Sequence, residues 1–369
     1  MTALISCANW QTVRSFEASK QFKDGYFQNE SPITLTDFKK MVGILSRTLF
    51  EESGETVPTT SIPLVQLTNQ QLLDEQPLGP AVYRLGHSSL LLSLSGKFWL
   101  IDPVFSQRAS PVQWAGPKRF HPTPITLDQL PEISGVIISH DHYDHLDRET
   151  ITQLRDQVEH FVTPLGVGTH LQKWGVEDSR IHELDWWEEI TLGPVHLTAT
   201  PAQHFSGRGI RDRNRTLWSS WVIRTPETSL FFSGDSGYFA GFKEIGKRFG
   251  PFDLTMIESG AYDRDWPDVH MTPEQTLQAH LDLKGRALMP IHNGTFNLAF
   301  HAWRDPFEQL AELSEEQSVR LLTPIMGQRV SMTEPPIYSA WWRDPLGHTA
   351  NRLATNPSIT RSNRAPTPK

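Results

Sequence analysis

Six consecutive residues of this chain carry three imidazoles and a carboxylate at a spacing suited to metal binding. They are His140-Asp141-His142-Tyr143-Asp144-His145. Burying these groups costs free energy unless something positive satisfies them. With 15 histidines in 369 residues, the pattern His-x-His-x-Asp-His is expected by chance in roughly one of 750 such chains. A polar surface loop is therefore the weaker interpretation, and a metal site is the stronger one.

The segments around this cluster predict how it is positioned. Residues 135–139 form an apolar run that ends at His140, which is typical of a buried strand carrying ligands at its end. His204, Asp235 and His292 each follow another predicted strand, and His270 precedes a predicted helix. Taken singly, each would be a helix cap or a solvated loop residue. Taken together, they indicate one site at the edge of a sheet.

The remaining pattern predicts two sheets with helices outside them. Ser95-Gly96 is a plausible tight turn between two strand-like segments. Strands are expected over 89–94, 97–101, 161–163, 189–199 and 220–232 (both as hairpins), 253–257, 287–291 and 320–325. Helices are expected over 148–157, 166–173, 273–283 and 305–313.

Bulk properties exclude some function classes. A net charge of −8 and a pI near 6.0 argue against a nucleic-acid partner, which would require a basic surface. The single cysteine, Cys7, rules out an intramolecular disulfide and suits a reducing compartment. No apolar run is long enough to span a bilayer. We therefore expect a cytoplasmic protein.

The two ends of the chain differ from its middle. Residues 38–49 have the periodicity of a basic amphipathic helix with Lys39, Lys40 and Arg47 on its polar faces. Such a helix packs on its own domain or lies on an anionic membrane surface, and the packing interpretation is favoured. Residues 346–369 are rich in polar residues and proline, which predicts a disordered tail.

The order of the candidate ligands resembles that of the metallo-β-lactamase superfamily over residues 83–324. Within it, the chain is most similar to the N-acyl-phosphatidylethanolamine-hydrolysing phospholipase D family and its bacterial relatives. The motifs that carry this likeness lie at residues 85–89, 101–105, 139–147, 183–187, 201–206 and 270–275. The resemblance implies an α/β fold, a four-layer αββα sandwich, over residues 79–345. Residues 1–78 would then be a segment packing on that core.

The same resemblance implies the roles of the candidate ligands. One metal would be held by His140, His142 and His204, a second by Asp144, His145 and His292, and Asp235 would bridge them. Nitrogen and oxygen ligands without thiolate favour two zinc ions, with iron or manganese left open. Two such ions can share a hydroxide that attacks a phosphodiester. Two divalent ions together with the carboxylates of Asp144 and Asp235 and one hydroxide carry a net charge near +1. This residual positive charge favours an anionic substrate.

Roles for the surrounding residues are also predicted. Asp144, Asp235 and His270 are the expected catalytic residues, with His270 and His87 contacting substrate. Asp102 would accept the free N–H of a ligand histidine, and Asp141 would face solvent. Trp186 and Trp187 would pack under the ligand loops, with lipid contact as the alternative.

Three functions are compatible with such a site. The first is a phosphodiesterase acting on a phospholipid, which would bring peripheral contact with a membrane. The second is a lactonase or a phosphodiesterase acting on small sugar phosphates or nucleotides. The third is a metal-dependent sensor without turnover, which the full ligand set disfavours. A homodimer is left open.

Overall fold

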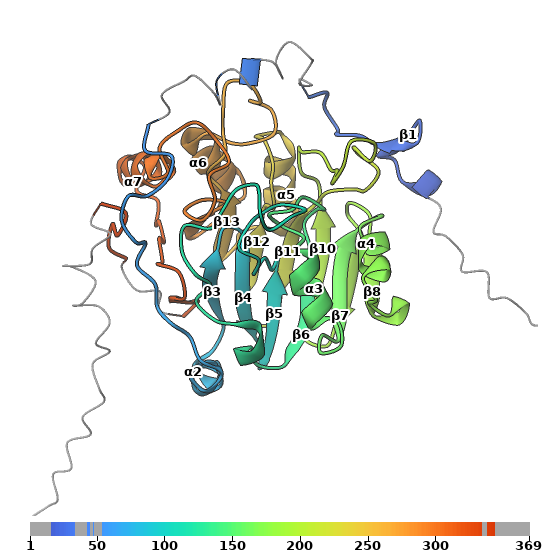
Figure 1. Cartoon of the computed structure of the whole chain (residues 1–369), viewed down its shortest axis with the longest axis horizontal. Helices are drawn as coiled ribbons and strands as arrows, with labels where there is room; N and C mark the ends of the chain where they lie inside the picture. Colours follow the sequence, from blue (N-terminus) through green and yellow to red (C-terminus); the bar gives the residue numbers. More distant parts are fainter. Residues whose placement is uncertain (1–15, 34–42, 45–46, 48–53, 334–337, 344–369) are drawn as a thin grey trace, which may run out of the picture.

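The computed structural model describes residues 16–33, 43–44, 47, 54–333 and 338–343. Its strands form two large sheets and a small hairpin near the N-terminus (Figure 1). The hairpin consists of β1 (Phe22–Lys23) and β2 (Tyr26–Phe27) and follows the short helix η1 (Phe16–Ala18). Among the described residues, no helix has the length and apolar character needed to cross a membrane.

The first large sheet has seven strands, mixed in direction. In spatial order these are β15 (Arg329–Ser331), β3 (Ala81–Gly86), β4 (Ser89–Leu94), β5 (Lys97–Ile101), β6 (Ile133–Ile137), β7 (His160–Pro164) and β8 (Ile181–Leu184). β5 to β8 run parallel to one another, and β3 to β5 form antiparallel pairs. The predicted turn at Ser95-Gly96 joins β4 to β5, with both residues in the left-handed region.

The second sheet has six strands. In spatial order these are β14 (Leu288–Ile291), β13 (Leu254–Glu258), β12 (Ser229–Phe232), β11 (Ser220–Arg224), β10 (Val195–Thr200) and β9 (Glu189–Leu192). β12 to β14 are parallel, whereas β9 to β12 form antiparallel pairs.

Helices cover the outer faces of the two sheets. The first sheet is covered by α2 (Asn69–Glu75), α3 (Arg148–Leu154) and α4 (Gly168–Lys173). The second is covered by α5 (Gly241–Phe249), α6 (Pro273–Asp282) and α7 (Asp305–Glu316). Short 3-10 turns complete the chain: η2 (Gln76–Leu78), η3 (Leu127–Gln129) and η4 (Asp178–Arg180).

Three apolar layers hold these elements together. Trp99 and Ile137 of the first sheet meet Trp221 and Phe232 of the second in the central layer. Separate clusters lie beneath the helices on each outer face. Burial of apolar area on this scale is the main favourable term in folding. The predicted four-layer αββα sandwich is therefore confirmed.

Several elements differ from the sequence-based expectations. No strand covers residues 320–325, where Leu321 forms a single bridge to Leu288. The last strand within the described residues is β15, which pairs with β3 in the other sheet, so the chain crosses to that sheet after β14. The helix predicted over 38–49 lies largely outside the described residues, and so does the tail from 346 to 369.

Candidate metal centre

The candidate ligands gather because their strands end at the same edge of the sandwich. β3, β5 and β6 point in one direction, and His87, Asp102 and His140 follow their carboxyl ends. β10, β12 and β14 also share one direction, and the ligands beyond them are His204, Asp235 and His292. Ligand binding outside the carboxyl ends of strands is a general property of open α/β sheets.

Four of the predicted ligands form a first group, His140, His142, His204 and Asp235. Their ligand atoms all lie within 4.8 Å of one another. His142 Nδ1 is 2.9 Å from His140 Nε2 and 3.2 Å from His204 Nε2. One oxygen of Asp235 is 3.7 Å from the Nε2 atoms of both His140 and His204. This is the arrangement expected of side chains that share one cation.

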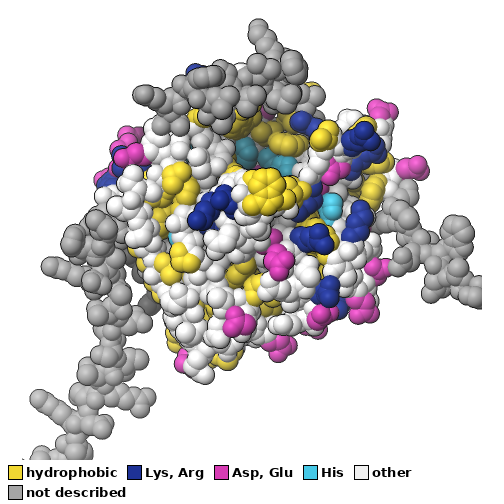
Figure 2. Space-filling model, in the orientation of Figure 1, with side chains coloured by type: hydrophobic (Ala, Val, Ile, Leu, Met, Phe, Trp, Pro, Cys, Tyr) yellow, Lys and Arg dark blue, Asp and Glu magenta, His cyan; other side chains and the backbone are white. Residues whose placement is uncertain are grey.

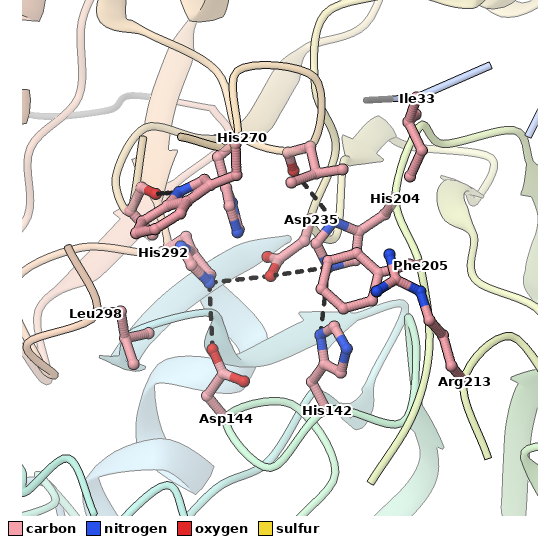
Figure 3. Close-up of a pocket in the computed structure, with 13 residues that line it drawn as sticks. Ile33, His142, Asp144, His204, Phe205, Arg213, Asp235, His270, His292 and Leu298 are labelled. Atoms are coloured by element: carbon pink, nitrogen blue, oxygen red, sulfur yellow. Dashed lines mark hydrogen bonds and ion pairs between the residues drawn. The ribbon is translucent and has the colours of Figure 1, made fainter. Parts of the chain in front are cut away.

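The second group contains Asp144, His145 and His292, together with His87. Asp144 Oδ2 is 3.2 Å from His292 Nε2 and 3.5 Å from His145 Nε2. Asp235 also reaches this group, because its two oxygens are 3.1 Å from His145 Nε2 and 3.0 Å from His292 Nε2. Asp235 therefore lies between the two groups, as a bridging ligand must (Figure 3).

Four buried side-chain atoms of this site have no hydrogen-bond partner among the described residues. They are His145 Nε2, Asp235 Oδ1, and the Nδ1 atoms of His87 and His292. A buried polar atom left unpaired is costly, and a cation near His145 Nε2 and Asp235 Oδ1 would satisfy those two atoms. Seven nitrogen and oxygen ligands without sulfur suit two divalent ions such as zinc. The residues therefore fit the predicted metals.

The charges of the second group also call for cations. Burial would raise the pKa of Asp235, but His145 and His292 hold it well below its usual range. Burial would lower the pKa of His292, yet the carboxylates of Asp235 and Asp144 raise it to about 10. The pKa of His145 is raised well above normal against the effect of burial, mainly by Asp235. Protons are thus held where divalent ions would compete with them.

Asp102 supports the second group from behind. Its Oδ2 lies 2.7 Å from His145 Nδ1 and accepts a hydrogen bond from Ser139 Oγ at 2.6 Å. Its Oδ1 accepts from the backbone N–H of Ser139 at 2.7 Å. The side chain is fully buried, and burial raises its pKa while His145 lowers it. This is the geometry predicted for a carboxylate that orients a ligand histidine.

His87 was predicted to contact substrate, but the structure places it against the ligand Asp144 instead. Its Nε2 is 2.9 Å from Asp144 Oδ2, and its side chain is buried. Burial lowers the pKa of His87 to about 3, so the imidazole is neutral. It does not line the cavity described below. The structure therefore places His87 behind Asp144, where it can orient that carboxylate.

Backbone strain is concentrated in the same residues. His87, Asp102 and His292 have φ values of 53°, 40° and 62°, in the left-handed region that residues other than glycine rarely adopt. Such conformations persist only where the surrounding structure enforces them. Gly234, just before Asp235, has φ 57°, and a Cβ there would lie 2.7 Å from Ser139 Cβ. The chain therefore turns sharply just before Asp235.

Glu258 is a site residue that the sequence analysis missed. It ends β13, is fully buried, and its Oε2 is 2.8 Å from His270 Nδ1. Its other oxygen accepts a hydrogen bond from Met271 N at 2.7 Å. Burial raises the pKa of Glu258, although His270 opposes this effect. An acidic residue at the end of a buried strand was the available signal, the same one that indicated Asp235.

Asp141 was expected to face solvent, and this expectation is wrong. Its side chain is buried and accepts hydrogen bonds from Gly207 N at 2.8 Å and Thr216 Oγ1 at 3.0 Å. Arg208 also donates to the carbonyl of Asp141, at 2.6 Å. Asp141 thus joins the ligand loop to residues 207–216, which explains why a charged residue is buried between two ligands.

The predicted packing of Trp186 is confirmed. Trp186 is buried in a cluster with Trp218 and donates through its indole N–H to the Trp218 carbonyl at 2.6 Å. Trp187 is partly buried against this cluster and against the one beneath α5, α6 and α7.

Arg47 donates to both oxygens of Asp263, at 2.6 and 2.9 Å, and so contacts the protein's own domain.

A cavity of about 290 Å³ opens beside both ligand groups. Its apolar and aromatic lining comes from Ile33, Phe205, Ala261, Trp266, Val269 and Leu298, and its polar lining comes from Arg213, His270 and the ligands His142, Asp144, His204, Asp235 and His292. Figure 3 shows these side chains around one space, and Figure 2 shows histidines at the bottom of a hollow on the molecular face. A small substrate can therefore reach the ligands.

Comparison with known proteins agrees with this geometry. Residues 99–293, more than half of the chain, match the family model described as a beta-lactamase superfamily domain. The chain belongs to the metallo-β-lactamase superfamily. The matched segment contains all seven predicted ligands. With relatives named as hydrolases among its matches, the chain is assigned to the metal-dependent hydrolases of this superfamily.

The similarity to individual proteins extends over most of this chain. An uncharacterized protein of Mycobacterium tuberculosis is 42% identical over 332 residues, covering 89% of this chain and 88% of that one. The N-acyl-phosphatidylethanolamine-hydrolyzing phospholipase D 1 of Caenorhabditis elegans is 32% identical over 326 residues, covering 81% and 91%. An isothiocyanate hydrolase from Delia radicum gut bacteria shares the fold, with a TM-score of 0.55, 20% identity, and coverage of 71% and 100%.

Proposed function

We propose that this hydrolase binds two divalent ions, most readily zinc, and cleaves the phosphodiester of an N-acylated ethanolamine phospholipid. The likeness to the Caenorhabditis elegans enzyme supports the substrate class. The two adjoining ligand groups that share Asp235 support the count of two ions. Two metals 3.5–4 Å apart are a common arrangement in phosphodiester hydrolysis.

The composition of the cavity is the observation that carries this proposal. One part of its wall is apolar, with Phe205, Trp266 and Leu298, and Arg213 adds a cation to the lining. An acyl chain favours the apolar wall because its burial removes hydrocarbon from water. A phosphate favours the guanidinium of Arg213. The acidic residues that line the cavity are Asp144 and Asp235, and both are predicted metal ligands. A substrate with both groups therefore matches the lining.

His270 and Glu258 supply proton chemistry in this proposal. Because Nδ1 of His270 is held by Glu258, its Nε2 is left to serve the cavity that the ring lines. When bound, the two metal ions lower the pKa of water and stabilise charge on the phosphoryl group. Water adds to phosphorus, the bond from phosphorus to the ethanolamine oxygen breaks, and that oxygen takes up a proton. N-acylethanolamine and phosphatidate are the products.

A substrate panel tests the proposal. Zinc-loaded protein is incubated with N-acyl-phosphatidylethanolamine, phosphatidylethanolamine, bis(p-nitrophenyl) phosphate or a lactone. The products are measured by mass spectrometry. We expect release of N-acylethanolamine, with slower cleavage of the lipid that lacks the N-acyl chain. Hydrolysis of the lactone without any diester cleavage would favour the lactonase alternative and overturn the proposal.

Arg213 offers a charge-specific test with a matched control. Replacing Arg213 by Met should raise KM for anionic diesters about tenfold, because a hydrogen-bonded charge contributes roughly 1.5 kcal/mol or more. The same change at Arg211, which is exposed in the same loop and does not line the cavity, should leave KM unchanged. Equal effects of the two variants would contradict a phosphate contact at Arg213.

A further inference from the structure

The N-terminal hairpin lies against the loop that carries His204. Residues 201–219 link β10 to β11, and in Figure 1 the blue strand β1 is drawn beside this yellow-green region. Phe27 is fully buried in a cluster with Trp186 and Trp218. Its backbone N–H donates to the Asn214 carbonyl at 2.8 Å. The hairpin is therefore anchored on both sides of His204 in sequence.

Asn29, two residues beyond the hairpin, bonds directly to the backbone of His204. Its side-chain N–H donates to the His204 carbonyl at 2.8 Å, and its side-chain oxygen accepts from the His204 N–H at 3.0 Å. The same oxygen accepts from the indole N–H of Trp218 at 3.1 Å. One amide thus pairs with both polar backbone groups of a predicted metal ligand, 175 positions further along the chain.

His204 depends on contacts of this kind because of where it lies. It is four residues beyond the end of β10, in a segment without regular secondary structure. Its ring is oriented by a hydrogen bond between Nδ1 and the carbonyl of Val269, at 3.1 Å. His142 and His145, in contrast, lie in a loop closed by its own bond, from His145 N to the His142 carbonyl at 3.1 Å. Asn29 fixes the backbone of His204, and Val269 fixes its ring.

We infer that Asn29 is a positioning residue for the first metal group, which makes that group dependent on the N-terminal segment. The second group contains His145 and His292 and has no hydrogen bond to residues 16–33 among the described contacts. Loss of Asn29 should therefore weaken one metal and spare the other. The inference rests on the metal sites of the proposed function and not on its substrate. Ile33, four residues later, completes the link by lining the cavity.

Metal titration of Asn29→Ala tests this inference. Purified protein is stripped and titrated with Zn²⁺ against a chromophoric chelator, and with Co²⁺ by absorption spectroscopy. We expect one equivalent with wild-type affinity and one weakened 10- to 100-fold, the range typical of lost outer-shell partners. The Co²⁺ spectrum should lose the contribution of one equivalent. Two equivalents of wild-type affinity, or equal weakening of both, would overturn the inference.

Three further variants keep the result interpretable. Asn29→Asp retains the acceptor for the His204 N–H and loses the donor to the His204 carbonyl, so an intermediate affinity for the first metal is expected. This variant decides the test if Asn29→Ala fails to fold. Asn297→Ala removes an exposed asparagine whose amide donates to Thr56 and should leave both affinities unchanged. Leu72→Ala destabilises the outer face of the first sheet and should lower the melting temperature without moving either metal. If phosphodiester cleavage is never observed, these metal affinities still decide the inference.

Discussion

Asp102→Asn tests whether the buried carboxylate behind His145 tunes the metal centre. The change preserves volume and removes the charge that faces His145 Nδ1 across 2.7 Å. The new amide can still accept from Ser139 N, but its NH₂ group faces Ser139 Oγ and the His145 ring. A hydrogen bond to a charged group contributes about 1.5–3 kcal/mol. Loss of this contact should therefore weaken the second metal by about 10- to 100-fold.

The assay is chelator competition with Zn²⁺ on the variant and on a matched control. Asp147→Asn is that control, because Asp147 is also buried but its side chain bonds Phe105 N, Ser106 N and Thr150 instead of a ligand. The control should lose stability in urea while keeping both metal affinities. If Asp102→Asn binds two Zn²⁺ with wild-type affinity, Asp102 does not tune the metal, and the reasoning from its geometry is wrong.

Three other perturbations have expected outcomes. Asp235→Ala should reduce bound metal from two equivalents to at most one and abolish hydrolysis, as measured by elemental analysis and a diester assay; retention of both ions would remove Asp235 from the bridging position. Gly234→Ala should destabilise the fold by about 2 kcal/mol, because the left-handed φ and a 2.7 Å approach to Ser139 Cβ both disfavour a side chain; an unchanged urea midpoint would show that the turn relaxes. Burial lowers the pKa of His280 to about 4, so its neutral form is favoured in the folded state and stability should fall by about 3 kcal/mol as pH drops from 6.5 to 4. His280→Gln should flatten that part of the curve, and an equally steep curve would place the acid lability elsewhere.

Much of the ligand set could be predicted from the sequence because the ligands lie in the loops that follow strands. The strand before His140 is largely apolar and buried throughout, and the small residues around Asp235 indicate a sharp turn. Strand direction then places these ends at one edge. Glu258 carried the same signal and could have been found in the same way.

The contacts that could not be predicted join distant loops. No local pattern relates Asn29 to His204, since a side-chain amide pairing with a backbone leaves no periodicity. Asp141 was misjudged because its neighbours in sequence are ligands, whereas the groups that satisfy it, Gly207 and Thr216, come from another loop. The last strand was misplaced because the apolar residues near 321 pack against β14 without extending its sheet beyond one bridge.

The aromatic hairpin near the N-terminus also has a consequence during synthesis. Phe16, Phe22 and Phe27 pack on one another, and their cover includes Trp218, which is 191 positions after Phe27. At translation rates of about 5–20 residues per second, Trp218 is made roughly 10–40 s after Phe27. Leu165 and Trp186 of the same cluster are made earlier in that interval, but the native cover of the three rings is complete only after Trp218. Apolar surface that the folded protein buries therefore stays exposed on the nascent chain for that time.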